Sequence, residues 1–325
     1  MRSRLIGLCA AVSLLALPPA GGTSAAASYP TRPVKIIVTF AAGGITDIVG
    51  RLLAQKMTED FGQRFYVENR PGAGGAVASE IAARAAPDGY TLEIASAGTH
   101  AINPSLYPHL AYDPVKDFVP ISLVSWEANL LIVRPDLPAK TFPELVALLK
   151  SSPHALNYGT AGFGSTTHLA MELLKMKSGT SITPVAYKGA SEVTQAVIAG
   201  QVDLAFNGTS TALAPVRSGS VRAIGVSSLK RSAVLPDVPA IAETLPGFEA
   251  LAWHALVAPA GTPQEVIDVL AREVQKIVRE PETATHMRGL GITPVGSTPA
   301  EFAKFMGDEI RKWAEVVKVS GAKVE

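Results

Sequence analysis

The sequence predicts an α/β protein of two lobes, each lobe a sheet flanked by helices. Short β-branched runs alternate with amphipathic helical patterns, as in doubly wound folds whose strands run parallel. Two such series follow each other along the chain, and the tail after them has only helical patterns. Because two helices without strands cannot form a lobe of this kind, we expect the tail to pack back on the first lobe.

The first series supplies the first lobe. It begins with the strand-like run VKIIVTF, and turn-forming stretches such as NRPGAGG and APDGY separate its elements. The expected elements are strands at 34–40, 64–69 and 90–96 and helices at Thr46–Glu59 and Gly75–Ala86.

The second series supplies the second lobe and follows the segment LLIVRPDLPAKTF. Its β-branched runs and helical patterns alternate in the same way. The expected elements are helices at Phe142–Lys150, Ser165–Lys177 and Ser191–Ala199 and strands at 156–161, 182–187, 202–207 and 221–228.

Two apolar stripes at helical spacing mark the tail, and such stripes belong to a core far more often than to a cofactor site. They are Val266, Ile267, Leu270, Val274, Ile277 and Val278, and then Phe302, Phe305, Ile310, Trp313, Val316 and Val317. A returning tail makes the chain cross between the lobes twice, near Ser125–Leu131 and Leu251–Val257. Residues 28–126 with 252–325 then form the first lobe and 127–251 the second, as in hinged binding proteins with a ligand in the cleft.

The first 27 residues have the pattern of a secretory signal peptide. Arg2 and Arg4 precede the apolar run Leu5–Leu17, and small residues follow up to Ala27. The run is too short to span a bilayer. We therefore expect cleavage near Ala27 and export to the periplasm.

Composition excludes several classes of function. Without the two arginines of the signal peptide, 27 basic residues face 28 acidic ones, a net charge of about −1, which gives no basis for nucleic-acid binding. The single cysteine, Cys9, lies in the signal peptide, so disulfides, thiol catalysis and thiolate metal sites are not expected. The six histidines show no metal-binding spacing, and no cofactor motif is complete.

Two segments, Val38–Lys56 and Leu156–Lys175, each combine a strand, a glycine-containing turn and a helix, and one lies in each lobe. A helix start offers free backbone N–H groups and the positive end of the helix dipole, which favours an anion. Ser165 stands where a phosphate loop requires Lys, so a carboxylate is a better match than a nucleotide. Its expected partners are backbone N–H groups and the hydroxyls of Thr46, Ser165 and Thr166, although each hydroxyl could instead only cap its helix.

Asp47 lies in the first turn of the first of these helices, where its charge opposes a bound anion. One interpretation is that it turns inward and accepts backbone N–H groups from a neighbouring loop, and we favour this one. The other is that it meets the amine of an amino-acid ligand.

Three further polar stretches, ASAGTHAINP, AYKGAS and FNGTST, are expected to be loops that follow the other strands, at the sheet edge where ligands of open α/β sheets bind. His168 either faces the rim of the cleft or packs, and with Ser165 it forms only a weak nucleophile–base pair for a secreted hydrolase. The candidates for the far end of the ligand are Ser96, Gly98, Thr99, Tyr187, Lys188, Asn207 and Thr209.

The order of motifs along the chain resembles that of the tripartite tricarboxylate transporter substrate-binding receptors, also called the Bug family of periplasmic binding proteins. The resemblance covers nearly the whole chain after the signal peptide. The motifs are YPTRPVKIIVTFAAGG followed by TD, VENRPGAGG, PDGYTL, INPSLY, YDPVKDF, YGTAGFGSTTHLA, AYKG, LPDVPAIAE, the tryptophan at 253 and APAGTP.

The resemblance implies a type II, Venus-flytrap receptor without catalytic residues, which hands a dicarboxylate, amino acid or aromatic acid to membrane permease subunits. A loaded receptor that docks on a membrane sensor is the alternative. Thr39 and Ala42 stand where the family usually has Pro. A monomer is expected. Two loops would grip the carboxylate, partly through ordered water. The first contributes Phe40, Ala42, Gly43, Gly44, Thr46 and Asp47, and the second contributes Ala161, Gly162, Gly164, Ser165 and Thr166.

Overall fold

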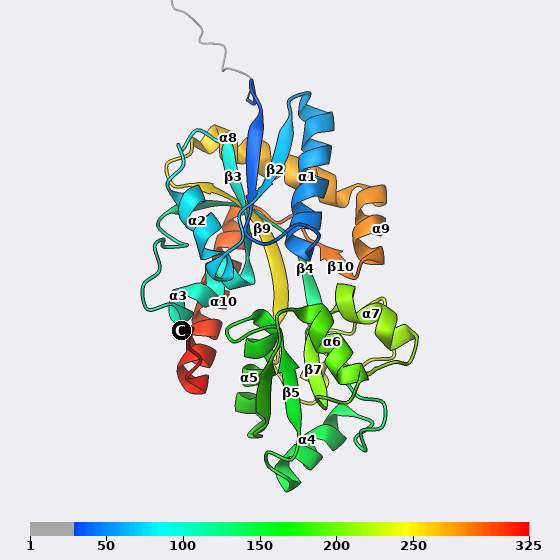
Figure 1. Ribbon diagram of the computed structural model, residues 1–325. Helices are drawn as coiled ribbons and strands as arrows, with labels where there is room; N and C mark the ends of the chain where they lie inside the picture. The colour runs from blue at the N-terminus through cyan, green and yellow to red at the C-terminus, as the bar shows by residue number, and fades with distance from the viewer. Residues whose placement is uncertain (1–28, 325) are drawn as a thin grey trace, which may run out of the picture.

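The computed structural model describes residues 29–324 and shows two α/β lobes joined by long strands (Figure 1). The predicted signal peptide, residues 1–27, lies outside the described residues. Within residues 29–324, no helix combines the length and the apolar character needed to cross a membrane. The expected two-lobed α/β class is confirmed.

The first lobe is built on three parallel strands in the order β2–β1–β3. Both faces of this small sheet are apolar, so helices cover them. In chain order the elements are β1 (Val34–Val38), α1 (Ile45–Phe61), β2 (Phe65–Asn69), η1 (Ala73–Gly75), α2 (Ala76–Ala83), β3 (Thr91–Ser96), η2 (Gly98–Ile102) and α3 (Asn103–Leu106).

Two long strands join the lobes, β4 (Phe118–Val133) and β9 (Leu251–Pro259). Residues 118–128 of β4 pair with β9, and residues 129–133 pair with β7 and β8 of the second lobe. The chain leaves the first lobe along β4 and returns along β9, so these two strands run antiparallel. The sequence patterns predicted parallel strands, and at the centre of the sheet this expectation is wrong.

The second lobe repeats the parallel arrangement with the order β7–β5–β6. Its helix α7 begins directly after β7, where the polar stretch FNGTST suggested a loop, and Pro215 lies inside this helix. The elements are α4 (Phe142–Ser151), β5 (Asn157–Thr160), α5 (Thr166–Ser178), β6 (Thr183–Ala186), α6 (Ala190–Ile198), β7 (Leu204–Gly208), α7 (Thr209–Arg217), β8 (Arg222–Val226) and η3 (Ile241–Glu243).

The tail contains α8 (Gln264–Arg279), α9 (Pro281–Gly289), β10 (Ile292–Pro294) and α10 (Pro299–Ser320). The predicted stripe of α8 is buried, and this helix packs on β4 and α1 of the first lobe. Helix α10 contacts η2 and α3 of the first lobe, but it also contacts α5 of the second. The tail therefore packs on the first lobe, as expected, and its last helix also contacts the second lobe.

Candidate functional site

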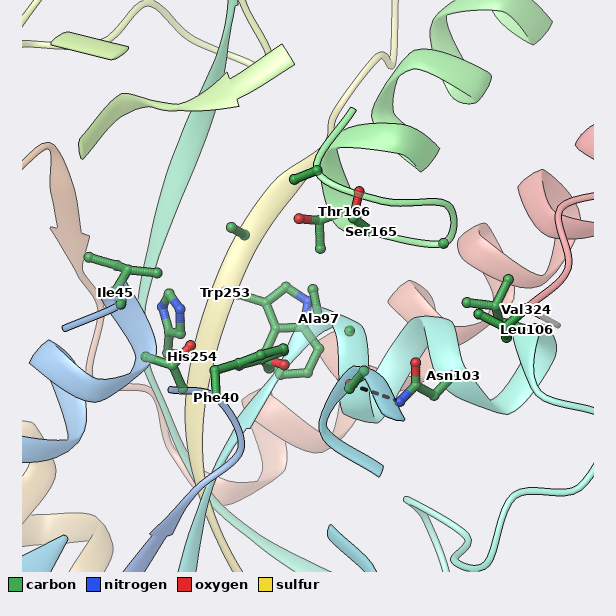
Figure 2. A pocket seen from close by; sticks show the side chains of 18 of the residues that line it. Phe40, Ile45, Ala97, Asn103, Leu106, Ser165, Thr166, Trp253, His254 and Val324 are labelled. Carbon is green, nitrogen blue, oxygen red and sulfur yellow. Dashed lines mark hydrogen bonds between the residues drawn. The ribbon is translucent and has the colours of Figure 1, made fainter. Parts of the chain in front are cut away.

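A cavity of about 500 Å³ lies between the β1–α1 loop of the first lobe and the β5–α5 loop of the second. Figure 2 shows Ser165 and Thr166 on one side of it and Phe40 and His254 on the other. The lining residues are Phe40, Gly44, Ile45, Thr46, Gly74, Ser96, Ala97, Gly98, Asn103, Leu106, Tyr107, Ala161, Phe163, Gly164, Ser165, Thr166, Ala252, Trp253, His254 and Val324.

Helix α1 starts at this cavity without a side-chain cap. Its N-cap residue is Gly44, which has no side-chain oxygen to accept the N–H groups of the first turn. Gly43 before it has φ +84°, a value that L residues rarely adopt. The first turn of α1 is therefore open to an anion, with Thr46 in the cavity wall.

Helix α5 starts on the opposite side of the same cavity, with Ser165 as its N-cap residue. The Ser165 Oγ accepts the backbone N–H of His168 at 3.2 Å and lies 3.1 Å from the Oγ1 atoms of Thr160 and Thr167. The Ser165 hydroxyl thus caps its helix, which was one of the two interpretations. Thr166, the first residue of the helix, lines the cavity beside it.

Asp47 turns away from the ligand side and fastens the β1–α1 loop. Its Oδ2 accepts the backbone N–H of Gly43 and the Nε of Arg51, each at 2.9 Å, and its Oδ1 accepts Asn69 Nδ2 at 2.9 Å. Asn69 Nδ2 also donates to the Phe40 carbonyl at 3.0 Å. Burial would raise the pKa of Asp47, but these hydrogen bonds outweigh it and hold the pKa below its usual range.

Trp253 and His254 of β9 form the rear wall. The Trp253 Nε1 donates to Glu309 Oε2 at 3.0 Å, and the same oxygen accepts Trp313 Nε1 at 3.0 Å, so α10 holds this wall in place. His254 is 2% exposed, and its Nδ1 is buried with no hydrogen-bond partner among residues 29–324. Burial lowers the pKa of His254 to about 4, so the imidazole is neutral at pH 7.

The next feature is the lack of charged side chains among the described residues of the cavity wall. Among the described residues that line the cavity, none is Lys, Arg, Asp or Glu. An anion here would have to be held by neutral donors, which are backbone N–H groups and hydroxyls, and by the positive ends of two helices. The arrangement could therefore hold a small anion by hydrogen bonds.

Several candidate residues lie beside the cavity rather than in its wall. Ala42, Gly43 and Gly162 belong to the two loops, and Thr99 is buried behind Ser96, whose N–H it accepts at 3.0 Å. Tyr187 and Asn207 support the second lobe: Tyr187 N donates to the Thr160 carbonyl, and Asn207 Nδ2 donates to the Ala190 carbonyl. Of the remaining candidates, Lys188 is exposed and Thr209 is buried.

His168 is buried one turn into α5, and its Nδ1 accepts the backbone N–H of Gly164 at 3.2 Å. A nucleophile–base pair would need this lone pair to accept from the Ser165 hydroxyl. The lone pair instead points at the backbone of the loop. Burial lowers the pKa of His168. Within residues 29–324, no three His, Cys, Asp or Glu side chains are grouped so that they could hold a metal ion.

Other lining residues were not singled out from the sequence as site candidates. Phe163 sits within a loop whose other members were named, and the motif INPSLY contains Asn103, Leu106 and Tyr107. Val324 reaches the cavity from the end of the described chain. These residues are brought in by tertiary packing, which local patterns do not report.

Comparison with known proteins agrees with this geometry. Residues 49–322 match the family described as "Tripartite tricarboxylate transporter family receptor". Protein BugT of Bordetella pertussis is 34% identical over 323 residues, which are 99% of this chain and 98% of BugT.

Two solved structures share the fold along the whole of their own length. R. palustris Rpa4515 with adipate is 34% identical with a TM-score of 0.81, and the match covers 91% of this chain and 100% of that chain. MatC from Rhodopseudomonas palustris with bound malate is 36% identical with a TM-score of 0.77, and the match covers 89% and 100%. The resemblance noted in the motifs is confirmed, and the protein belongs to the tripartite tricarboxylate transporter family of receptors.

Proposed function

We propose that the protein is a periplasmic receptor that captures a small organic carboxylate between its lobes and delivers it to a membrane permease. The observation that carries the proposal is that two helix starts, one from each lobe, open into one cavity. One carboxylate between them would contact both lobes at once, which favours the closed state over the open state. Related structures contain adipate or malate, which supports a carboxylate ligand.

The grip consists of backbone N–H groups at Gly44–Asp47 and at Thr166 and Thr167, with the Thr46 and Thr166 hydroxyls beside them; the Ser165 N–H already donates to the Gly162 carbonyl. Hydrogen bonds to a charged group contribute about 1.5–3 kcal/mol each, so a few of them suffice for micromolar affinity after the cost of association. The lobes in this proposal are residues 28–126 with 252–325, and residues 127–251.

Isothermal titration with a panel of small carboxylates tests the receptor role. We expect one ligand per chain and a change in tryptophan fluorescence, because Trp253 lines the cavity. Thr166→Val removes one hydroxyl and should weaken binding about tenfold, whereas Thr244→Val, an exposed position outside the cavity, should change nothing. A panel that gives no binding and no thermal stabilisation would contradict the proposal.

Delivery to a permease requires a separate test. We expect cells that lack the receptor to lose uptake of the radiolabelled ligand, and cells that lack the permease to show the same loss. If uptake persists without the receptor while a ligand-dependent transcriptional response disappears, the receptor acts on a membrane sensor instead.

A further inference from the structure

His254 of β9 is a buried polar side chain in the cavity wall whose ring nitrogens are not used by the described part of the chain. The side chain is 2% exposed, and its Nδ1 is buried without a hydrogen-bond partner among residues 29–324. Nε2 also makes no hydrogen bond to these residues, but it is not completely buried. Buried polar side chains are nearly always paired, so an unpaired imidazole at a cavity indicates a partner that enters the cavity.

The burial of Nδ1 decides where this imidazole carries its proton. A neutral imidazole has one N–H group and one lone pair, so the proton is on either Nδ1 or Nε2. A proton on Nδ1 would leave a buried N–H group without an acceptor, which is rarer in proteins than a buried acceptor without a donor. With the proton on Nε2, the N–H group can instead be accepted by water or by a ligand in the cavity. His254 is therefore a neutral hydrogen-bond donor to the cavity.

Ser96 of β3 supplies a second neutral donor next to His254. The two residues are directly opposite each other in the antiparallel β3–β9 pair, so their side chains are on the same face of the sheet, and both line the cavity. The Ser96 Oγ lies 3.3 Å from both Oγ1 and N of Thr99, which is long for hydrogen bonds of these kinds. The Ser96 hydroxyl can therefore turn toward a ligand.

The cavity is also larger than the group that the two helix starts would hold. Its volume is about 500 Å³, of which a carboxylate group fills only a small part. Figure 2 shows His254 on the side of the cavity opposite Ser165 and Thr166. A ligand whose carboxylate lies at the helix starts thus has room to extend along the wall that contains His254 and Ser96.

We propose that His254 and Ser96 form a second polar subsite, which binds an oxygen atom of the ligand at a distance from the carboxylate held at α1 and α5. This oxygen belongs to a hydroxyl group or to a second carboxylate, and either can accept the N–H group of His254 and the hydroxyl of Ser96. The inference rests on the proposed function, because it assumes that a carboxylate lies at the helix starts. It makes His254 and Ser96 the residues that select acids with a second oxygen-bearing group over acids with a purely apolar body.

Two series of acids test the subsite by isothermal titration of the signal-peptide-free protein. Butyrate, 4-hydroxybutyrate and succinate share one chain length, and hexanoate, 6-hydroxyhexanoate and adipate share another, so members of a series differ only at the far end. In at least one series, we expect the hydroxy acid or the diacid to bind at least about tenfold more tightly than the simple acid. The preferred acid shows whether the oxygen comes from a hydroxyl or a carboxylate. Equal affinities within both series would overturn the inference and leave the proposed function intact, whereas no binding by any of the six acids would count against both.

Variants show whether this preference depends on the two proposed residues. His254→Phe keeps a ring without an N–H group, and Ser96→Ala removes only a hydroxyl. Each should weaken binding of the preferred acid about tenfold and leave the affinity for the simple acid within about twofold of wild type. A purely structural role of either residue would instead weaken both acids alike.

Ser125→Ala is the matched control for these variants. Ser125 lies opposite His254 in the β4–β9 pair, and its Oγ is also buried without a partner among residues 29–324, but it is outside the cavity wall. This variant should bind all six acids within about twofold of wild type. A preference that survives in both His254→Phe and Ser96→Ala would refute the subsite, and if His254→Phe does not fold, Ser96→Ala alone decides.

Discussion

Gly164 of the second lobe lies against Leu106 of the first lobe so closely that a Cβ built on the glycine would stand 2.4 Å from Leu106 Cδ2. Both residues line the cavity. A real Cβ does not approach another carbon to this distance, so a side chain at residue 164 would force Leu106 or the two lobes to shift apart here.

We therefore expect Gly164→Ala to weaken ligand binding by holding the lobes apart. Gly179→Ala at the C-terminal end of α5 is a matched control: Gly179 also has positive φ, at +64°, but it lies outside the cavity wall and a Cβ there would meet no atom within 4 Å. Both variants should lose about 1–2 kcal/mol of stability through backbone strain. Only Gly164→Ala should also lower ligand affinity in isothermal titration, and equal affinities for the two variants would contradict this expectation.

Asp47→Asn should destabilise the protein by about 1.5–3 kcal/mol at pH 7, because an amide has one acceptor oxygen for donors that now use two, Gly43 and Arg51 on Oδ2 and Asn69 on Oδ1, and because it has no charge to pair with Arg51. The pKa of Asp47 is held below its usual range in the folded protein. Its stabilising contribution is therefore present above about pH 4 and is lost as the pH falls through the folded-state pKa.

Urea unfolding of wild type and Asp47→Asn at several pH values measures this contribution. The difference in unfolding free energy should shrink in acid. Asp308→Asn on the exposed face of α10 is the control and should stay within about 0.5 kcal/mol of wild type. A difference between wild type and Asp47→Asn that does not depend on pH would contradict the role assigned to the carboxylate.

Glu93 of β3 should make the protein less stable as the pH rises. It is fully buried, 3.8 Å from His100 Nδ1, and accepts Ser79 Oγ at 2.7 Å. Burial raises the pKa of Glu93 to about 8 and lowers the pKa of His100 to about 3, so at pH 7 both are mainly neutral. The pKa of Glu93 is higher in the folded than in the unfolded protein. The contribution of Glu93 to the free energy of unfolding is therefore full below about pH 4 and decreases as the pH rises to about 8.

Glu93→Gln keeps the shape of this side chain but cannot ionise. Between pH 5 and 8 we expect the unfolding free energy of wild type to fall by an amount on the order of a few kcal/mol, and the variant to lack this loss. Thermal or urea unfolding of both proteins measures the difference. Parallel stability profiles for wild type and variant would refute this assignment.

Glu309→Ala should cost about 2–6 kcal/mol, because it leaves the buried indole N–H groups of Trp253 and Trp313 without an acceptor. Glu309→Gln keeps one oxygen for the indoles and loses only the ion pair with Lys312, so its cost should be smaller. Urea unfolding of both variants gives the comparison, and an equal loss for Ala and Gln would show that the indole hydrogen bonds are not the stabilising contacts.

The parts of the fold that follow a strong local period were predictable. The stripe of α8 has the 3.6-residue period of a helix, and all of its predicted members are buried. The β1–α1 and β5–α5 loops could be located because glycine, hydroxyl residues and a following helical pattern coincide there. The interpretation that Asp47 turns inward is also confirmed, but the backbone N–H that it accepts is that of Gly43 in the β1–α1 loop before its own helix and not one from a neighbouring loop.

The rest depends on contacts between distant segments. The π-helical η2 and the four-residue α3 are too short to show a period, so their segment was expected to be a loop. Strand β9 is buried along nearly its whole length, so no alternation of polar and apolar residues shows which side chains face the cavity. His254 and Trp253 were therefore not recognisable as cavity residues from the sequence.

The open start of α1 also bears on how this receptor can change over evolution. Every residue except proline has a backbone N–H group, so substitutions other than those to proline leave these donors in place. Substitutions at Phe40, Phe163 or Leu106 would then change the shape of the ligand that fits the cavity. The backbone N–H groups would still bind the anionic group of that ligand. A binding site of this design can acquire a new substrate in small steps, without passing through a form that binds nothing.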